Sequence, residues 1–558
     1  MIMKNYFMKS SVALMVLSAA LAGCSQEDVL QNTPAQPSDN ELKLSVSTQD
    51  FVSDAQGRAI TNNDDKRTSV FEDGDQMGLY IFSEDGEVLC DNLLYTYNED
   101  KWTTDKTIYQ YKNAQYVAYF PYCKDLSGVT GAESITKYFT DNILPTVSQK
   151  NAETYEQADL MVSTTSQVDG TNVKLTLAHQ FSMIELNVPC RKYITQAGGF
   201  EYAAPVKMNV KINEQKDLYR AADGVYRMIV EPGKMPAIEG SVEYDAGMPI
   251  NFSSESVSAT IESGKFTQFN VTYDDPAVQG LQVDEATGRY IRDLKPGDYY
   301  YSDGTIYPYD ENKANQPFKE GCIGVIFEVG TGAPGTEWNH GSVLALNNAH
   351  SDWSRWGNTG APKEDNSVTA IQGSVELYNF LSGKMDGYTL TGTFTAEVGG
   401  LDCAFKKISL FGTEDSSLGK WVFPQYAAPV GITSGWYMPS AGQLMAIWSG
   451  LGGYTVTTDN YMNNMATDHA NKLASVAKIR AAIEKVDGTF VSKSENDTEK
   501  NTQRWWSTTE WDDKNTWTME WNLSETANGW STGFSSRNKV NGWNDRSTKA
   551  YARPVLSF

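Results

Sequence analysis

Short segments in which apolar and polar residues alternate recur through the first half of the chain. Residues 42–46 and 173–177 alternate strictly, and residues 77–82 and 116–122 are further apolar segments with turn residues between them. Successive side chains of a strand point to opposite faces, so alternation is typical of a strand with one buried face. A series of such strands predicts an antiparallel β-sandwich, which we assign to residues 42–189.

The alternation changes phase after Met183, where Ile184, Leu186 and Val188 become the inward-facing set. A change of phase within one segment predicts a bulge, or a strand that passes from one sheet to another. Similar alternation continues through residues 190–284, and it predicts a second, smaller β-sandwich there.

The tryptophans are unevenly distributed, and they mark a change of module. Thirteen of the 14 tryptophans lie at or after residue 338. In this half, Ser440 and Gln443 form a capping box that predicts the start of a helix, and a second helix is predicted over residues 466–486. We therefore expect an α+β domain over residues 285–558, with two helices on a small mixed sheet.

Charge and composition exclude several classes of function. Lysine and arginine total 46 and aspartate and glutamate total 70, so the net charge of −24 would repel nucleic acid. The six cysteines include no CxxC pair, which argues against a zinc site or a disulfide framework. No Ser/His/Asp, paired-carboxylate or metal constellation stands out, so we expect neither an enzyme nor a cofactor. The lone His179 is predicted to be a core histidine with a local hydrogen bond.

The N-terminus has the pattern of a secretory signal peptide. Two lysines precede a short apolar run that ends in Leu-Ala-Gly-Cys at residues 21–24. This ending resembles a bacterial lipobox, in which the Cys24 thiol is acylated and Cys24 becomes the first mature residue. The resemblance implies a signal peptide over residues 1–23, a lipidated tether over residues 24–41, and a palmitate-bearing lipoprotein exposed at the cell outer membrane. The alternative is an ordinary signal peptide followed by a chance cysteine.

Five motifs in the first half together resemble one family. They are, in chain order, residues 71–80, 116–122, 158–161, 177–182 and 264–271. This series after a lipobox is similar to that of the fimbrillins, the pilus subunits of Bacteroidales. The resemblance covers roughly half of the chain, and it implies two transthyretin-like antiparallel β-sandwich domains. It also implies a place in a fimbrium, with other pilus subunits as partners.

The resemblance has a specific consequence for the loop after the first strand. Fimbrillins are cut in this loop by an arginine-specific protease, and loss of the first strand opens a groove that a strand of a neighbouring subunit fills. Here residues 53–69 form an unusually long polar segment. It contains Arg58-Ala59, which resembles the family cleavage point, and Arg67-Thr68 as the alternative. Both arginines are expected to be exposed.

The second half resembles a different kind of surface module. The helix start at residues 436–444, the Trp-Trp-Ser-Thr-Thr-Glu strand at 505–510 and the ending Arg-Pro-Val-Leu-Ser-Phe at 553–558 are its landmarks. They are similar to those of C-type lectin-like and formylglycine-generating-enzyme-like domains. The catalytic relatives use a late cysteine pair, and no cysteine follows Cys403, so that chemistry is not supported.

The end of this module holds candidate ligand-binding residues. Trp543-Asn544-Asp545 is similar to the lectin calcium triplet, so Asn544 and Asp545 are candidate Ca²⁺ ligands, although the partner triplet is absent. Trp530 and Trp543 lie in segments rich in Gly, Asn and Ser and are candidate ligand-facing residues, since an aromatic plane fits the C–H face of a sugar. The other tryptophans are predicted mainly to fill the core, among them Trp436, Trp448, Trp505 and Trp517.

These expectations combine into one functional hypothesis. The last strand, residues 555–558, is expected to be needed inside its own domain, so the chain accepts a donor strand but does not donate one. A subunit that only accepts belongs at the distal end, so we expect a pilus tip adhesin that meets a glycan or a host or bacterial surface. The alternative is a non-polymerising surface lipoprotein, or a pilus anchor that keeps its lipid, and that binds glycan.

Overall fold

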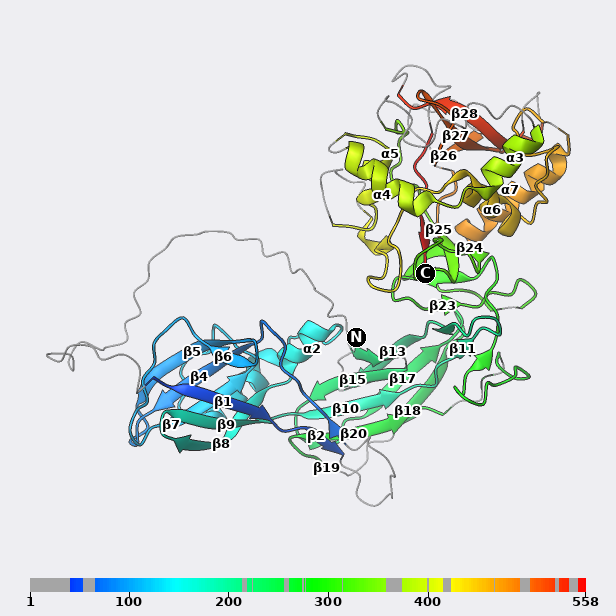
Figure 1. Cartoon of the computed structure of the whole chain (residues 1–558). Helices are drawn as coiled ribbons and strands as arrows, with labels where there is room; N and C mark the ends of the chain where they lie inside the picture. The colour runs from blue at the N-terminus through cyan, green and yellow to red at the C-terminus, as the bar shows by residue number, and fades with distance from the viewer. Residues whose placement is uncertain are drawn as a thin grey trace.

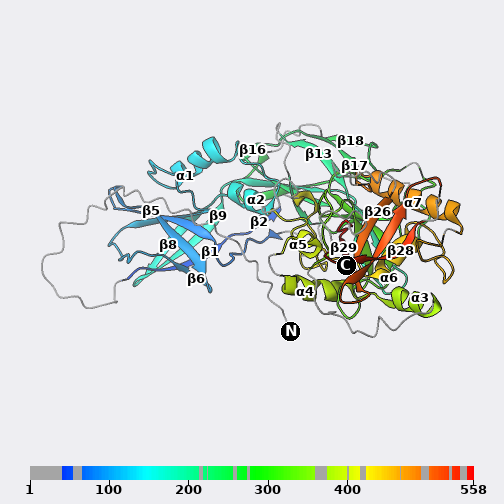
Figure 2. The same cartoon turned by 90° about the horizontal axis from the view of Figure 1, so that it is seen from above.

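The computed structural model shows a mainly β chain whose elements form three successive parts (Figure 1). The described residues are 41–53, 66–212, 218–222, 224–254, 260–272, 275, 277–313, 315–357, 374–398, 401–414, 423–465, 467–491, 502–526, 531–540 and 550–558. Figure 2 shows the first part extending away from the other two. Within the described part of the chain, no helix is both long and apolar enough to cross a bilayer.

The first part is a seven-stranded sheet in the order β1-β9-β8-β7-β4-β5-β6. Its strands are β1 (Lys43–Thr48), β4 (Gln76–Phe82), β5 (Val88–Asn98), β6 (Lys101–Thr103), β7 (Gln115–Phe120), β8 (Met161–Asp169) and β9 (Asn172–His179). The sheet curls until its edges approach, since the Leu42 amide donates to the Ile108 carbonyl at 2.8 Å, just after β6. Apolar side chains inside the curl, such as Met77, Leu79 and Leu175, are buried.

The other face of this sheet is covered by helices that the sequence did not indicate. They are α1 (Ala132–Tyr138), a π-helix (Phe139–Ile143) and α2 (Ala152–Ala158). A second buried cluster, which includes Tyr119 and Phe139, joins the sheet to these helices. The first sheet is therefore buried on both faces.

The chain passes into a second sheet between β9 and β10 (Ser182–Asn187). This sheet has six strands in the order β14-β15-β10-β20-β2-β3. The others are β2 (Phe51–Ser53), β3 (Lys66–Arg67), β14 (Tyr219–Ala222), β15 (Val225–Val230) and β20 (Lys265–Asn270). The change of sheet that the phase shift near Met183 predicts is present. It lies at residues 180–181, ahead of the expected boundary at residue 189, because β10 pairs with strands of the second part.

Several strands depart from the expected antiparallel pairing. β1 is parallel to β9, and β20 is parallel to both β10 and β2. Alternation reports which face of a strand is buried, but it carries no information on the direction of the neighbouring strands. Parallel neighbours need a long crossover connection, and strands β4 to β8 with their helices provide it between β1 and β9.

A three-stranded sheet packs against the six-stranded one in the second part. It contains β13 (Lys207–Ile212), β17 (Ile238–Glu243) and β18 (Ile250–Ser254). Ile184 and Leu186 of β10 share a buried cluster with Val210 and Val242 of this sheet. Shorter strands are β11 (Lys192–Ile194), β12 (Glu201–Ala203), β16 (Gly233–Lys234), β19 (Thr260–Ile261) and β21 (Tyr290–Ile291).

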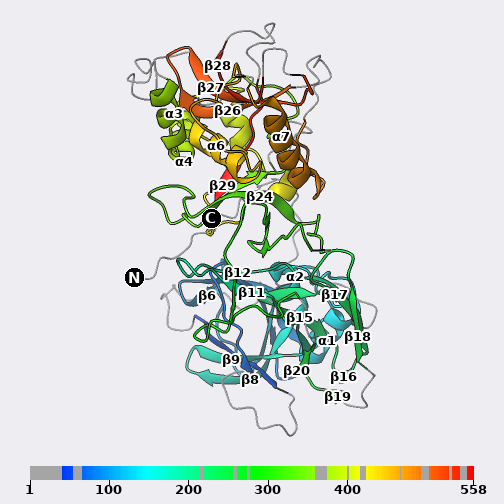
Figure 3. The same ribbon diagram turned by 90° about the vertical axis from the view of Figure 1, so that its right-hand side faces the viewer.

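The third part combines two sheets with helices (Figure 3). One sheet has the order β23-β22-β24-β25-β29 and the other the order β26-β27-β28. The strands are β22 (Tyr299–Tyr301), β23 (Ile306–Tyr307), β24 (Cys322–Val329), β25 (Gly341–Ala345), β26 (Thr502–Glu510), β27 (Asn515–Asn522), β28 (Gly533–Asn538) and β29 (Val555–Ser557). The helices are α3 (Ser374–Gly383), α4 (Gly387–Val398), α5 (Ala404–Ser409), α6 (Ala441–Gly450) and α7 (His469–Glu484), with a short 3-10 helix at Pro424–Tyr426.

The third part differs from the expected two helices on a mixed sheet. Its described residues hold five α-helices, and the named strands of both sheets pair antiparallel throughout. The two predicted helices are α6 and α7, and the Ser440 amide donates to Gln443 Oε1 at 3.0 Å in the predicted capping box. α4 is rich in threonine and glycine, which favour helices weakly, so its sequence carried little helical signal.

The second and third parts share a buried junction. Tyr202 of β12 belongs to one apolar cluster with Tyr300 and Phe558 of the third part. Asp245 of the second part accepts hydrogen bonds from the Tyr307 hydroxyl at 2.6 Å and from Arg191 Nη2 at 2.9 Å. The apolar cluster and the Tyr307–Asp245 hydrogen bond therefore both fix the third part on the second.

Candidate assembly site

The N-terminal strand runs along two sheets as one extended segment, which we call the β1–β2 strand (residues 43–53; Figures 1 and 2). All six residues of β1 are in register with β9. The Gln49 amide then donates to the Leu177 carbonyl at 2.8 Å, and the Val52 amide donates to the Gly264 carbonyl at 3.0 Å where β2 joins β20. The β1–β2 strand thus completes the backbone hydrogen bonding of both sheets.

The same segment supplies side chains to two separate cores. Leu44 and Val46, with Leu42 directly before the segment, pack in the cluster inside the first sheet, whereas Phe51 belongs to the cluster on the other face. Phe51 is 2% exposed. Removal of the segment would uncover apolar positions and unpaired backbone groups along β9 and β20, which is the kind of surface that an added strand fills.

His179 forms the floor beneath Phe51. The two rings are stacked, with centroids 3.7 Å apart and an interplanar angle of 20°. His179 Nδ1 lies 2.8 Å from Asp159 Oδ1, and Nε2 lies 3.4 Å from the Ser69 hydroxyl. The prediction of a core histidine is confirmed, but its hydrogen-bond partners are not local, since Asp159 and Ser69 lie 20 and 110 residues away in the chain. The contact with Phe51 adds a role that the sequence did not indicate.

Arg67 of β3 lies over the sheet next to β2. Its Nε and Nη2 donate to the two oxygens of Glu185 at 2.8 and 2.6 Å, and its guanidinium carbon lies 4.5 Å from the centre of the Phe266 ring. The Arg67 side chain is 16% exposed. The expectation that Arg67 is an exposed loop arginine is therefore wrong, because β3 pairs with β2 and brings Arg67 to a carboxylate 118 residues away. Thr68, directly after it, is exposed.

Glu185 is the buried centre of this ion-pair cluster. Arg227 Nε also donates to it at 2.9 Å, and Gln268 Nε2 donates at 3.2 Å. Burial raises the pKa of Glu185, but the hydrogen bonds from Arg67 and Arg227 outweigh burial and hold the pKa below its usual 4.5. Glu185 is therefore a charged group whose stabilisation depends on Arg67 staying in place.

The last described strand, β29, is bonded on both sides. It pairs antiparallel with β25, and on its other side the Val555 amide and carbonyl bond to Tyr437 at 2.9 and 2.8 Å. The Tyr437 hydroxyl lies 2.6 Å from Ser557 Oγ, and both residues are buried. The expectation that this strand is needed inside its own domain is confirmed by these contacts.

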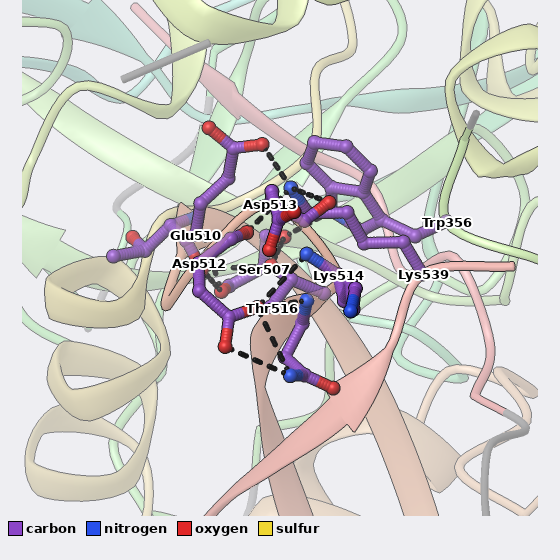
Figure 4. Close-up of polar contacts among 10 residues, drawn as sticks. Trp356, Ser507, Glu510, Asp512, Asp513, Lys514, Thr516 and Lys539 are labelled. Atoms are coloured by element: carbon purple, nitrogen blue, oxygen red, sulfur yellow. Dashed lines mark hydrogen bonds and ion pairs between the residues drawn. The ribbon is translucent and has the colours of Figure 1, made fainter. Parts of the chain in front are cut away.

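A buried ion pair holds the turn between β26 and β27 (Figure 4). The Lys539 amine is paired with the Glu510 carboxylate and donates to the Asp512 carbonyl at 2.8 Å. The Trp356 ring centre lies 5.0 Å from Lys539 Nζ. Since the two charges compensate each other and are buried, the cluster stabilises the turn and does not offer a free charge to a ligand.

This turn presents an aromatic side chain to solvent. Trp511 is 39% exposed and stacks on Trp517, with ring centroids 5.0 Å apart and an interplanar angle of 4°. Trp517 is buried, as predicted, and so are Trp448 and Trp505, while Trp436 is partly buried. The sequence analysis did not single out Trp511, which directly follows the strand that ends at Glu510; the available signal was the Asp-Asp turn after it.

Most of the residues singled out from the sequence lie outside the described ranges. They are Cys24, Arg58, Ala59, Trp530, Trp543, Asn544 and Asp545. Among the residues that are described, no group of three or more His, Cys, Asp or Glu side chains could hold a metal ion. The lipidation, cleavage and calcium assignments stay predictions.

Residues 57–287 match the model of the Fimbrillin-like family. Over these residues the chain is similar to fimbrillins. A Bacteroides ovatus protein named "Putative fimbrium tip subunit Fim1C" is 24% identical over 504 residues, which are 80% of this chain and 87% of that protein. A crystal structure of a fimbrial protein from Bacteroides ovatus covers 94% of this chain and 100% of its own, with 19% identity and a TM-score of 0.48. The lectin-like nature of residues 285–558 stays a prediction.

Proposed function

We propose that the chain is a strand-accepting fimbrial subunit, located at or near the tip of the fimbrium and assembled by donor-strand exchange. An arginine-specific protease cuts after Arg58, the β1–β2 strand leaves, and a strand of the neighbouring subunit takes its place. The observation that carries this proposal is the course of residues 43–53, which lie at the edge of the first sheet and supply backbone partners to two sheets. Arg58 is favoured over Arg67 because Arg67 is held by Glu185.

The tip position rests on the contacts of β29. Its hydrogen bonds to β25 and to Tyr437 keep it inside the third part, so this strand is not free to enter a neighbour. A subunit that accepts a strand without donating β29 terminates growth at the distal end. The name of the Bacteroides ovatus relative, a fimbrium tip subunit, supports the same position.

The proposal also includes the membrane-bound precursor and the binding of a ligand at the fimbrial tip. Acylation of Cys24 would hold the precursor at the outer membrane until it is processed. At the tip, the third part would meet a glycan or another surface ligand, and the exposed Trp511 supported on Trp517 is the feature of the described residues that suits stacking on a sugar. Ca²⁺ bound through Asn544 and Asp545 belongs to this part of the proposal.

N-terminal sequencing of the protein on intact cells tests the proposal. An N-terminus at Ala59 is the expected result, and an N-terminus at Thr68 would support assembly through the alternative cut. A protein found only with an acylated Cys24, and with no trimmed form, would contradict the tip assignment. It would instead favour an anchor or a non-polymerising surface lipoprotein.

A further inference from the structure

Phe51 marks the point where the β1–β2 strand enters a second core. Leu42, Leu44 and Val46 alternate into the cluster inside the first sheet. Gln49 then follows, with its amide still bonded to β9, and Phe51 enters the cluster that contains Phe181 and Phe266. Phe51 thus lies five positions after Val46, the last of the alternating apolar residues. Strand alternation places residues on one face at even spacings, so this odd spacing takes Phe51 to the other face.

The His179 ring, on which Phe51 stacks, is held in place by its own hydrogen bonds. His179 Nδ1 lies 2.8 Å from Asp159 Oδ1, and His179 Nε2 lies 3.4 Å from the Ser69 hydroxyl oxygen. Both ring nitrogens are engaged with groups outside the β1–β2 strand. The ring therefore keeps its orientation when Phe51 leaves, and its stacked face becomes available to the next occupant.

We infer that this position is an aromatic-selective subsite for the strand that another subunit inserts. The inference deepens the proposed function and rests on it. The matching strand carries apolar residues at three alternate positions and a Phe, Tyr or Trp five positions after the last of them, as Leu42, Leu44, Val46 and Phe51 do here. An aliphatic side chain fills the volume but lacks a flat face for His179, whereas an aromatic ring retains the stacking.

The rim of the subsite stays with the body of the protein after a cut at Arg58. Arg67 follows the cut, remains bonded to Glu185, and lies over Phe266, which is opposite Ser53 in the sheet. An incoming strand therefore contacts the same Arg67 and Phe266 side chains as the strand that it replaces. Because these contacts are unchanged by the cut, a peptide with the native sequence of the β1–β2 strand is a suitable test ligand.

The test uses the full chain, cut with an arginine-specific protease, and a fluorescent synthetic peptide with the sequence of residues 42–53 in excess. Peptide retained by the protein is measured after gel filtration, with uncut protein as the blank. The peptide is expected to bind the cut chain. The Phe51→Ala peptide is expected to bind about 100-fold more weakly and the Phe51→Leu peptide about fivefold more weakly. A Val52→Ala peptide, altered at a position 38% exposed, is the matched control and is expected to change affinity less than about twofold.

Two outcomes separate the inference from the proposed function. If the native peptide does not bind the cut chain, the proposed function is overturned, and the subsite with it. If the native and Phe51→Leu peptides bind equally, the aromatic subsite is overturned while strand exchange stands. A His179→Leu chain, cut in the same way, is expected to lose the preference for Phe over Leu; because the peptide series alone decides the question, the conclusion does not depend on the folding of this variant.

Discussion

Arg67 on β3 is bonded to Glu185 on β10 across the width of β2 and β20, with Nη2 2.6 Å from Oε1. The contact joins the short strand after the cleavage segment to the middle of the second sheet. The Glu185 side chain is 1% exposed, so its charge relies on Arg67 and Arg227. The pair therefore stabilises the sheet around β2, a role that the sequence did not indicate for Arg67.

Glu185→Gln is expected to lower the free energy of unfolding by about 3 kcal/mol, because it leaves two partly buried arginines without their carboxylate. Urea denaturation measures this loss. The matched control is Asp141→Asn, which removes an exposed i,i+4 pair with Lys137 and is expected to cost less than about 0.5 kcal/mol. Equal effects of the two substitutions would show that the Arg67–Glu185 contact does not stabilise the sheet.

The same carboxylate predicts a dependence on pH. The pKa of Glu185 in the folded chain lies below the usual 4.5, since hydrogen bonds from Arg67 and Arg227 outweigh burial. A carboxyl whose pKa is lowered by folding contributes stability that is present above pH 4.5 and lost as the pH falls through the folded pKa. The difference in urea stability between wild type and Glu185→Gln is therefore expected to shrink as the pH falls below 4.5. A difference that is constant between pH values of about 7 and 3 would contradict the ion-pair explanation.

Processing by an arginine-specific protease is expected to depend on Arg58 and not on Arg67. Arg58→Gln should prevent the cut, and Arg67→Gln should leave the cut unchanged. Proteases need accessible chain, whereas Arg67 of β3 is paired with Phe51 of β2 and is bonded to Glu185. Intact-mass measurement after limited digestion identifies the product. A fragment that begins at Thr68 in the wild-type protein would contradict this expectation.

The local elements of the chain could be predicted because their signals lie within a few residues. The alternation in residues 173–177 predicted β9, and the Ser440–Gln443 capping box predicted the start of α6. The phase change near Met183 gave the passage between sheets. In each case the pattern records burial or capping by near neighbours, which is what periodicity measures.

The features that build the assembly site could not be predicted, because they join residues far apart in the chain. The parallel pairing of β1 with β9 spans more than a hundred residues, and no local pattern sets strand direction. The polar composition of residues 53–69 predicted exposure, whereas Arg67 is held by a distant carboxylate. One signal was available: Glu185 is a lone acid between apolar residues of β10, and such a buried charge needs a partner.

The aromatic pair of the third part gives a prediction for ligand binding. Trp511→Ala is expected to abolish binding on a glycan array with little change in melting temperature, because Trp511 is partly exposed. Trp517→Ala is expected to destabilise the third part by about 3–5 kcal/mol, because it leaves a cavity in the core. Glycan arrays run with and without EDTA, and with the Asp545→Ala variant, test separately whether glycan binding depends on calcium. Glycan binding that survives Trp511→Ala would assign the ligand to another surface.

The hydroxyl of Tyr437 should be important for holding β29 in place. It lies 2.6 Å from Ser557 Oγ and accepts from Gln443 Nε2 at 2.7 Å, all within the buried core. Tyr437→Phe is therefore expected to lower stability by about 1–3 kcal/mol, since it leaves buried polar groups without a partner. Hydrogen exchange at the Val555 amide should be correspondingly faster in the variant.

The same amide distinguishes a retained strand from a donated one. In wild-type protein the Val555 amide is expected to exchange only through opening of the third part, and at the same slow rate before and after assembly with other subunits. Faster exchange at Val555 in the assembled fimbrium, or a crosslink from β29 into the groove of another subunit, would show that the strand leaves its domain. That result would move the chain from the tip into the stalk, because it would then both accept and donate.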